Sequence, residues 1–300
     1  MRPSTESQVA LNSCPNLPIP EQVNPVNPAE STCAAIAEKL SKLPPFGPAV
    51  QNLLRISLDD DSAVRLFEDA FMSDPALTAE LLVMANSAAF GGRSRVQTIG
   101  MAIRNLGLER VRSLATTSAL RSHTQRGPDQ QYLASVWAHG VATAVAAEAL
   151  GELSGFPDLY TLGLTHDLGR LGLFLAGGQA YAVALSKEFL GIEQADQAER
   201  NLFGVTHCQA GAVVAAVWGF PDSLAACMGQ HHSLPSGAQG GPRGMIVTAC
   251  QMADSLGFPE VPLTDTPGWP ELCPSLERNP QLEPEALWDQ ITRRIADLRA

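Results

Sequence analysis

The sequence predicts an all-α protein. Apolar residues recur three and four positions apart along most of the chain, which is the spacing of one face of a helix. Helix-start signals support this interpretation: at Asp74-Pro75 an acidic residue stands at the cap position and proline at the first helical position. No sustained alternation of β-branched and polar residues appears, so strands are not expected.

The N-terminal part of the chain changes character near residue 28. Residues 1–28 combine prolines with Ser, Asn and Gln and offer little to bury, so we predict a disordered tail. Residues 29–126 are expected to form an N-terminal helical part, in which Ser31 caps the first helix and Gly91-Gly92 and Gly107 separate later ones. The predicted helices span residues 31–43, 48–56, 62–71, 74–87, 98–106 and 109–122.

A turn at Gly127-Pro128-Asp129 marks the start of a second helical part, residues 127–258. Its first helix is rich in alanine, which would let neighbouring helices approach closely. The predicted helices span residues 131–150, 159–168, 179–190, 192–202, 206–217, 222–230 and 245–256. Residues 259–300 form a proline-rich linker and a charged helix, 284–298, which packs either on the domain or on a second subunit in a homodimer.

Composition limits the classes of partner. The 45% hydrophobic content supports a substantial core, and the formal charge of −11 disfavours nucleic-acid and anionic-membrane binding. The N-terminus lacks the apolar segment of a secretory signal, and no segment approaches the ~20 apolar residues of a membrane span. The six cysteines show neither zinc-finger spacing nor a disulfide framework. We therefore expect a reduced, cytoplasmic protein.

One local exception to the acidic character is a run of arginines. The simpler interpretation is a solvated helix face, and the alternative is a docking surface for an acidic partner. The run comprises Arg93, Arg95, Arg104, Arg110, Arg112, Arg121 and Arg126.

The chemistry of the chain centres on His166-Asp167. Imidazole and carboxylate together suit first-row metals, and adjacent positions on a helix would let both side chains lean toward one ion. The dipeptide gains weight from its setting, because the chain has only six histidines and five of them, with two aspartates, follow one order along several predicted helices. A metal site in a helical bundle is built from such inward-facing residues. The predicted ligands are His139, His166, Asp167, His207, His231, His232 and Asp254.

These residues also have simpler interpretations. Taken singly, each histidine is more often a hydrogen-bonded core residue than a ligand, and only the joint pattern favours metal binding. His123 falls outside the pattern, at a helix C-terminus where its charge suits the dipole. Cys208, beside His207, lacks the context of a nucleophile and is interpreted as a buried helix position.

The order of these residues resembles that of the HD superfamily of metal-dependent phosphohydrolases. Separated motifs narrow the resemblance to the HDOD domain, the HD-related output domain of bacterial signalling proteins, over roughly residues 40–256. These motifs are Leu43-Pro44-Pro45-Phe46-Gly47-Pro48, Asp74-Pro75-Ala76-Leu77, Leu82-Val83-Met84-Ala85-Asn86-Ser87, Ala102-Ile103-Arg104-Asn105-Leu106-Gly107, Phe203-Gly204-Val205-Thr206-His207 and Trp218-Gly219-Phe220-Pro221. The resemblance implies an HD-like helical bundle preceded by an N-terminal helical subdomain.

The resemblance also implies roles for the predicted ligands. His139, His166, Asp167 and Asp254 match the ligands of one ion, and the remaining three histidines match those of a second ion that Asp167 would bridge. We expect one or two divalent ions, with Mn, Fe, Ni and Zn all suited to nitrogen and oxygen ligands. If the site hydrolyses phosphodiesters, Asp167 and Arg170 are the candidate catalytic residues.

Three departures from the hydrolytic relatives favour a signalling module without strong catalysis. Arg170 replaces a lysine, Ser135 stands where two-metal enzymes place a glutamate, and a Gly-Tyr-Pro loop is replaced by residues 233–237. HDOD domains are generally regarded as signalling modules, so signalling proteins are the expected partners. The alternative is an active phosphohydrolase acting on a nucleotide or cyclic dinucleotide.

Overall fold

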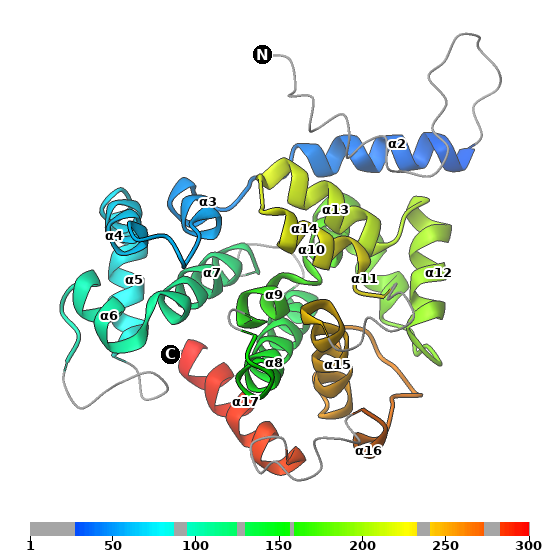
Figure 1. Ribbon diagram of the computed structural model, residues 1–300. Helices are drawn as coiled ribbons and strands as arrows, with labels where there is room; N and C mark the ends of the chain where they lie inside the picture. The colour runs from blue at the N-terminus through cyan, green and yellow to red at the C-terminus, as the bar shows by residue number, and fades with distance from the viewer. Residues whose placement is uncertain are drawn as a thin grey trace. The chain divides into compact units, whose positions relative to one another are not determined.

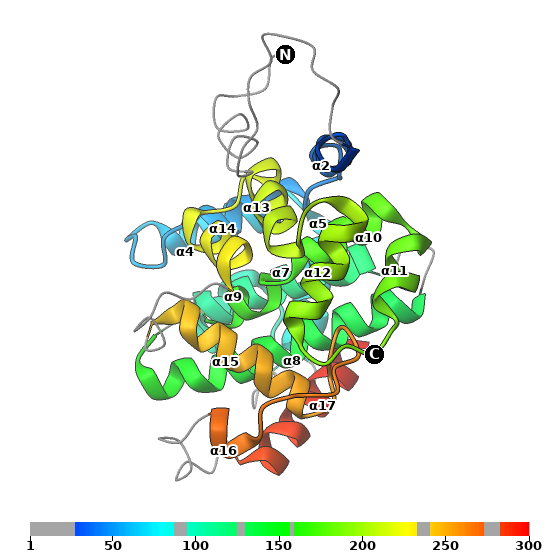
Figure 2. The ribbon, with the colours of Figure 1, turned by 90° about the vertical axis from the view of Figure 1, so that its right-hand side faces the viewer.

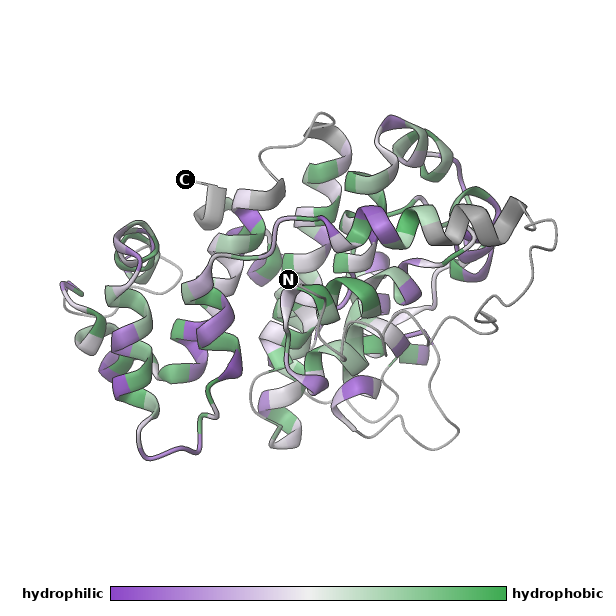
Figure 3. Ribbon diagram, turned by 90° about the horizontal axis from the view of Figure 1, so that it is seen from above, coloured by the Kyte–Doolittle hydropathy of each residue, from purple (hydrophilic) through white to green (hydrophobic). Residues whose placement is uncertain are grey.

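The computed structural model describes residues 28–86, 95–124, 130–156, 159–232, 241–272 and 283–299. Among these residues every regular secondary-structure element is a helix, and the only β-type pairing is an isolated bridge between Phe189 and Leu263. The all-α prediction is confirmed. Figure 3 shows that most helices carry both hydrophobic and hydrophilic residues, as helices do when one face packs inward. The predicted N-terminal tail, the turn at Gly127-Pro128 and the loop after His232 lie outside the described residues.

The chain divides into two compact units, each assembled from separate stretches of sequence. Unit 1 comprises Met1–Pro45, His166–Leu234 and Val261–Thr266, and unit 2 comprises Phe46–Thr165, Pro235–Glu260 and Pro267–Ala300.

In unit 1, α10, α13 and α14 pack side by side, and α2 packs on both α10 and α13 (Figure 1). Glycines set the close approach of these helices. A Cβ on Gly169 would overlap the carbonyl oxygen of His207, and one on Gly211 would lie 3.0 Å from the carbonyl oxygen of Met228. The helices of unit 1 are α2 (Pro28–Ser41), α10 (Leu168–Gly177), α11 (Gln179–Leu185), α12 (Ile192–Phe203), α13 (His207–Trp218) and α14 (Asp222–Gln230).

In unit 2, the long helix α8 packs against α9, α15 and α17 (Figure 2). Helices α3 to α6 pack with one another and with α7, which also packs on α8 and α9. Ala142, Ala144, Ala146 and Ala147 of α8 are fully buried, as the close-packing prediction requires. The helices of unit 2 are α3 (Pro48–Arg55), α4 (Ala63–Met72), α5 (Pro75–Ala85), α6 (Ile99–Leu106), α7 (Leu108–Thr124), α8 (Gln130–Ser154), α9 (Leu159–Thr165), α15 (Pro242–Ser255), α16 (Trp269–Leu272) and α17 (Pro284–Arg299).

The closing helix α17 packs on its own chain. Leu287 and Ile291 are fully buried, and Arg294 lies 3.3 Å from Glu148 of α8. Of the two alternatives for this helix, packing on the domain is therefore the observed one.

Three sequence-based expectations need correction. The helix expected over residues 159–168 ends at Thr165, and the next helix, α10, was not predicted. The helix expected over 179–190 ends at Leu185, because Phe189 instead pairs with the segment at Leu263. Residues Tyr132–Ser154 of α8 are long and apolar enough to cross a membrane by length and composition, although no such segment was expected. In the fold, 78% of the most apolar window of that stretch is buried, as in a core helix.

Candidate metal centre

His166 and Asp167 lie in the turn between α9 and α10. Asp167 occupies the N-cap position of α10 with φ −107° and ψ 17°, and its side chain makes no capping hydrogen bond. The carboxylate is instead directed at other side chains of unit 1. Its Oδ1 lies 3.4 Å from Nε2 of His207 and 3.5 Å from Nε2 of His231.

Arg170, one turn further along α10, joins two carboxylates. Its Nε donates to Oδ2 of Asp167 at 3.1 Å, and its Nη1 donates to Oε1 of Glu199 at 2.8 Å. The Arg170 side chain is 1% exposed and the Glu199 side chain is fully buried, so both charges depend on this pairing. The Tyr181 hydroxyl donates to the same Glu199 oxygen at 2.7 Å.

His207 begins α13, where the predicted Thr206 cap is present. Thr206 accepts from the backbone of Gln209, and the Gln209 side chain accepts from the backbone of Thr206, which completes a capping box. The His207 backbone N–H donates to Oε2 of Glu199 at 2.7 Å, and its Nδ1 lies 2.7 Å from the same oxygen. One carboxylate therefore fixes both the helix end and the imidazole.

His231 and His232 follow α14, with His231 at its C-cap. Nδ1 of His231 lies 3.2 Å from the carbonyl oxygen of Met228, and Nδ1 of His232 lies 3.6 Å from Oδ2 of Asp196 on α12. The ring centroid of His231 lies 5.0 Å from that of His166, 5.2 Å from that of His207 and 4.3 Å from that of His232. Five predicted ligands thus gather within unit 1.

The electrostatics of this cluster favour charged side chains despite their burial. Burial opposes ionisation of Glu199, but the charges of His207 and Arg170 outweigh it and lower the pKa of the carboxyl. Burial and Arg170 oppose protonation of His207, yet Glu199 and Asp167 raise its pKa well above the usual value. Burial also opposes protonation of His231, and hydrogen bonds to Asp167 and Cys208 raise its pKa to about 9.

Comparison with known proteins identifies the family. The model of the HDOD domain family matches residues 43–234, which is more than half of the chain. The chain belongs to the HDOD family. A protein of Treponema pallidum (strain Nichols), described only as uncharacterized, is 25% identical over 233 residues, which cover 72% of this chain and 43% of that protein. The chain thus spans less than half the length of this curated relative.

Solved structures share the fold of this HDOD chain. An HDOD domain protein of unknown function from Geobacter sulfurreducens has a TM-score of 0.65 at 24% identity, covering 90% of this chain and 92% of its own. A Shewanella amazonensis SB2B protein named as a candidate phosphohydrolase has a TM-score of 0.61 at 24% identity, with coverages of 89% and 96%. A Marinobacter aquaeolei VT8 protein named as a candidate signal transduction protein has a TM-score of 0.62 at 18% identity, with coverages of 92% and 66%.

The other two predicted ligands of the HDOD domain, His139 and Asp254, belong to unit 2. Nδ1 of His139 lies 3.4 Å from Oδ1 of Asp254 and 2.9 Å from the carbonyl oxygen of Phe258, and its Nε2 lies 3.7 Å from Sγ of Cys250. His139 and Asp254 therefore lie next to each other within unit 2. The site of all seven ligands stays a prediction.

Sequence reasoning missed three residues of the HDOD cluster: Asp196, Glu199 and Cys208. Asp196 and Glu199 stand three apart on α12, on one helix face that precedes His207 in the chain, a spacing that could have suggested them. Cys208 is buried on a helix as predicted, but its Sγ also lies among the imidazoles. Burial opposes ionisation of the thiol, and the charge and hydrogen bond of His207, with hydrogen bonds from His231 and His232, lower its pKa to about 3.

The donors present fit a first-row divalent metal. Among the described residues of unit 1, one donor atom each from His166, Asp167 and His231 lie within 4.8 Å of one another, and Asp196, Glu199 and His207 form a similar group. Oxygen and imidazole ligands of this kind suit Mn, Fe, Ni or Zn. The residues that would hold an ion of the HD type in this unit are therefore His166, Asp167 and His231.

Proposed function

We propose that this HDOD protein is a metal-binding signalling module without strong hydrolytic activity. The observation that carries the proposal is the engagement of Asp167 and Glu199 by the buried guanidinium of Arg170. A two-metal hydrolase needs a carboxylate that bridges two cations. Here one oxygen of Asp167 already accepts from a fixed cation, and that positive charge disfavours a second metal ion beside it.

A hydrolytic function is the second candidate. It is favoured by the position of Oδ1 of Asp167, which lies 3.4 Å from Nε2 of His207 and 3.5 Å from Nε2 of His231, so that one oxygen faces two imidazoles. A bound ion would act there as a Lewis acid and lower the pKa of a water molecule. Arg170 would then position Asp167, since its side chain is 1% exposed.

Metal content and turnover distinguish these functions. We expect the protein purified without chelator to contain divalent metal at near-stoichiometric level by elemental analysis, and Asp167→Ala to reduce it. We expect hydrolysis of a generic phosphodiester or a cyclic dinucleotide, with added Mn²⁺ or Fe²⁺, to be the same for wild type and Asp167→Ala. Turnover that Asp167→Ala abolishes would overturn the signalling proposal, and absence of metal would leave only a structural adaptor.

Partner binding is proposed for the N-terminal helices of unit 2, with the protein acting in the bacterial cytoplasm. A hollow of about 330 Å³ lies between α5 and α7, lined by residues of both helices that include Glu80, Val83 and Arg121. Val83 is 71% exposed there, and Met72 at the end of α4 is 66% exposed. Exposed apolar side chains beside charged ones are typical of a protein-binding surface.

Site-specific cross-linking tests this surface. A photo-crosslinking amino acid at position 83 should capture a discrete protein in bacterial cells, because the side chain lies at the rim of the hollow. The matched control is position 65 on α4, where the Arg65 side chain is 84% exposed but does not line the hollow. Equal capture at both positions, seen by immunoblot, would remove the argument for this surface.

A further inference from the structure

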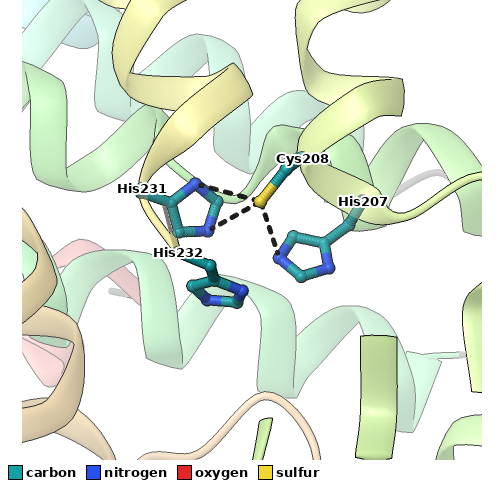
Figure 4. Close-up of side chains that lie close together, drawn as sticks. All are labelled: His207, Cys208, His231 and His232. Atoms are coloured by element: carbon teal, nitrogen blue, oxygen red, sulfur yellow. Dashed lines mark hydrogen bonds between the residues drawn. The ribbon is translucent and has the colours of Figure 1, made fainter. Parts of the chain in front are cut away.

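Cys208 lies within a compact group of imidazoles. Its Sγ is 3.6 Å from Nε2 of His207, and 3.8 and 3.9 Å from Nδ1 and Nε2 of His231. With His232, these residues offer four donor atoms that all lie within 4.8 Å of one another (Figure 4). In a tetrahedral zinc site, bonds of about 2.3 Å to sulfur and about 2.0–2.1 Å to nitrogen place sulfur about 3.6 Å from each nitrogen. The observed separations from sulfur are close to this value.

The outer contacts of the three imidazoles leave one nitrogen of each directed inward. Nδ1 of His207 lies 2.7 Å from Glu199, Nδ1 of His231 lies 3.2 Å from the Met228 carbonyl oxygen, and Nδ1 of His232 lies 3.6 Å from Asp196. Metal-binding histidines usually donate their other ring N–H to a carboxylate or a backbone carbonyl, which fixes the tautomer. His207 and His231 follow this arrangement, which leaves Nε2 of each ring as the ligand atom. Nδ1 of His232 faces Asp196 at a distance longer than a hydrogen bond.

The backbone holds the four residues in place. His207 and Cys208 open α13 behind the Thr206 capping box, and His231 and His232 close α14. The two helices approach closely because Gly229 of α14 faces Ala212 of α13, where a Cβ on Gly229 would lie 3.3 Å from Cβ of Ala212. The pair His207-Cys208 at the start of α13 and the pair His231-His232 at the end of α14 therefore lie close enough to form one site without movement of the helices.

We propose that His207, Cys208, His231 and His232 bind one zinc-class ion through three imidazoles and a thiolate. This inference rests on the proposed metal-binding function, and it places the ion among these four residues instead of at His166, Asp167 and His231. Asp167, 3.4 Å from His207 and 3.5 Å from His231, is then a neighbouring negative charge and not a ligand. A thiolate ligand favours zinc over manganese or magnesium, which prefer oxygen ligands. Four protein ligands close the coordination sphere, as in structural zinc sites, and leave no open position for a reacting water.

Cobalt substitution tests the sulfur ligand. The whole chain, stripped of metal and titrated with Co²⁺, should show a sulfur-to-cobalt charge-transfer band and the intense visible bands of tetrahedral cobalt. Cys208→Ser should abolish the charge-transfer band and weaken zinc binding by more than about 100-fold, the upper end of the loss caused by removing an outer partner. The matched control is Cys227→Ser, a buried cysteine of α14 outside the cluster, which should keep the band.

Two outcomes would overturn the inference. One is weak, octahedral-type cobalt absorption in the wild type, and the other is a charge-transfer band that survives in Cys208→Ser. Metal that binds without sulfur would refute this site and leave the proposed function intact. If Cys208→Ser does not fold, X-ray absorption on the zinc-loaded wild type decides: one sulfur at about 2.3 Å is expected, and a shell of nitrogen and oxygen alone would refute the proposal.

Discussion

Replacing Arg170 by methionine is expected to lower the free energy of unfolding by about 3–5 kcal/mol, the range for breaking a buried ion pair by removing one partner. Arg170 donates to Asp167 at 3.1 Å and to Glu199 at 2.8 Å, and Glu199 is fully buried. Methionine fills a similar volume, so the loss would arise from the two carboxylates that no longer face a cation. Urea unfolding followed by circular dichroism measures the change.

Arg200→Met is the matched control for Arg170→Met. Arg200 follows Glu199 directly on α12, but it is exposed, so its loss should change the unfolding free energy by no more than about 0.5 kcal/mol. Arg170→Lys should fall between the two variants, because an ammonium keeps the charge but lacks the planar fork that reaches both carboxylates. Equal effects of Arg170→Met and Arg200→Met would mean that the buried ion pairs are not formed in solution.

Local sequence signals predicted much of the fold. Asp74-Pro75 indicated the start of α5, and the Asp74 side chain does accept from the backbone N–H of Leu77 at 3.0 Å. Thr206 indicated the cap of α13 in the same way. Each of these signals depends only on residues within one helical turn, and such interactions can be read from the chain without knowing its tertiary structure.

The break at His166-Asp167 could not be predicted in this manner. Apolar residues continue at helical spacing from Leu159 to Leu168, and neither proline nor glycine stands at positions 166 and 167. The turn belongs instead to the tertiary structure, in which Asp167 faces His207 and His231 from distant parts of the chain. Tertiary contacts thus override a continuous local pattern.

The residues of the candidate site also differ in whether the sequence alone could predict them. The histidines and Asp167 stood out because His is rare in this chain and the residues follow one order. The spacing of Asp196 and Glu199 on one helix face is a weaker signal, because acids three apart on a helix are common on solvated faces. Only the packing of α12 beside the imidazoles, with Glu199 within 2.7 Å of Nδ1 of His207, distinguishes them from surface acids.

Gly169→Ala is the second substitution with a large expected effect, because α10 and α13 meet at this residue without space for a side chain. A Cβ on Gly169 would overlap the carbonyl oxygen of His207 and lie 2.7 Å from the backbone nitrogen of Gly211. Both neighbours are backbone atoms of a packed helix, which cannot rotate away as a flexible side chain could. The unfolding free energy should fall by about 3 kcal/mol, the upper part of the usual range for overpacking.

The same substitution should weaken metal binding, and a control variant shows what a glycine-to-alanine change costs where a Cβ has space. The clash falls on the backbone of His207, so it would displace the imidazole of His207 and the neighbouring thiolate of Cys208, and zinc or cobalt affinity should fall along with stability. The control is Gly47→Ala in unit 2, where a Cβ would meet only Asp74 Oδ2 at 3.9 Å, and which should cost less than about 1 kcal/mol even at a helix N-cap. Alanine would favour a helix in isolation, so a Gly169→Ala protein as stable as wild type would mean that α10 and α13 do not cross at backbone contact. The position of Asp167 beside the imidazoles depends on that crossing.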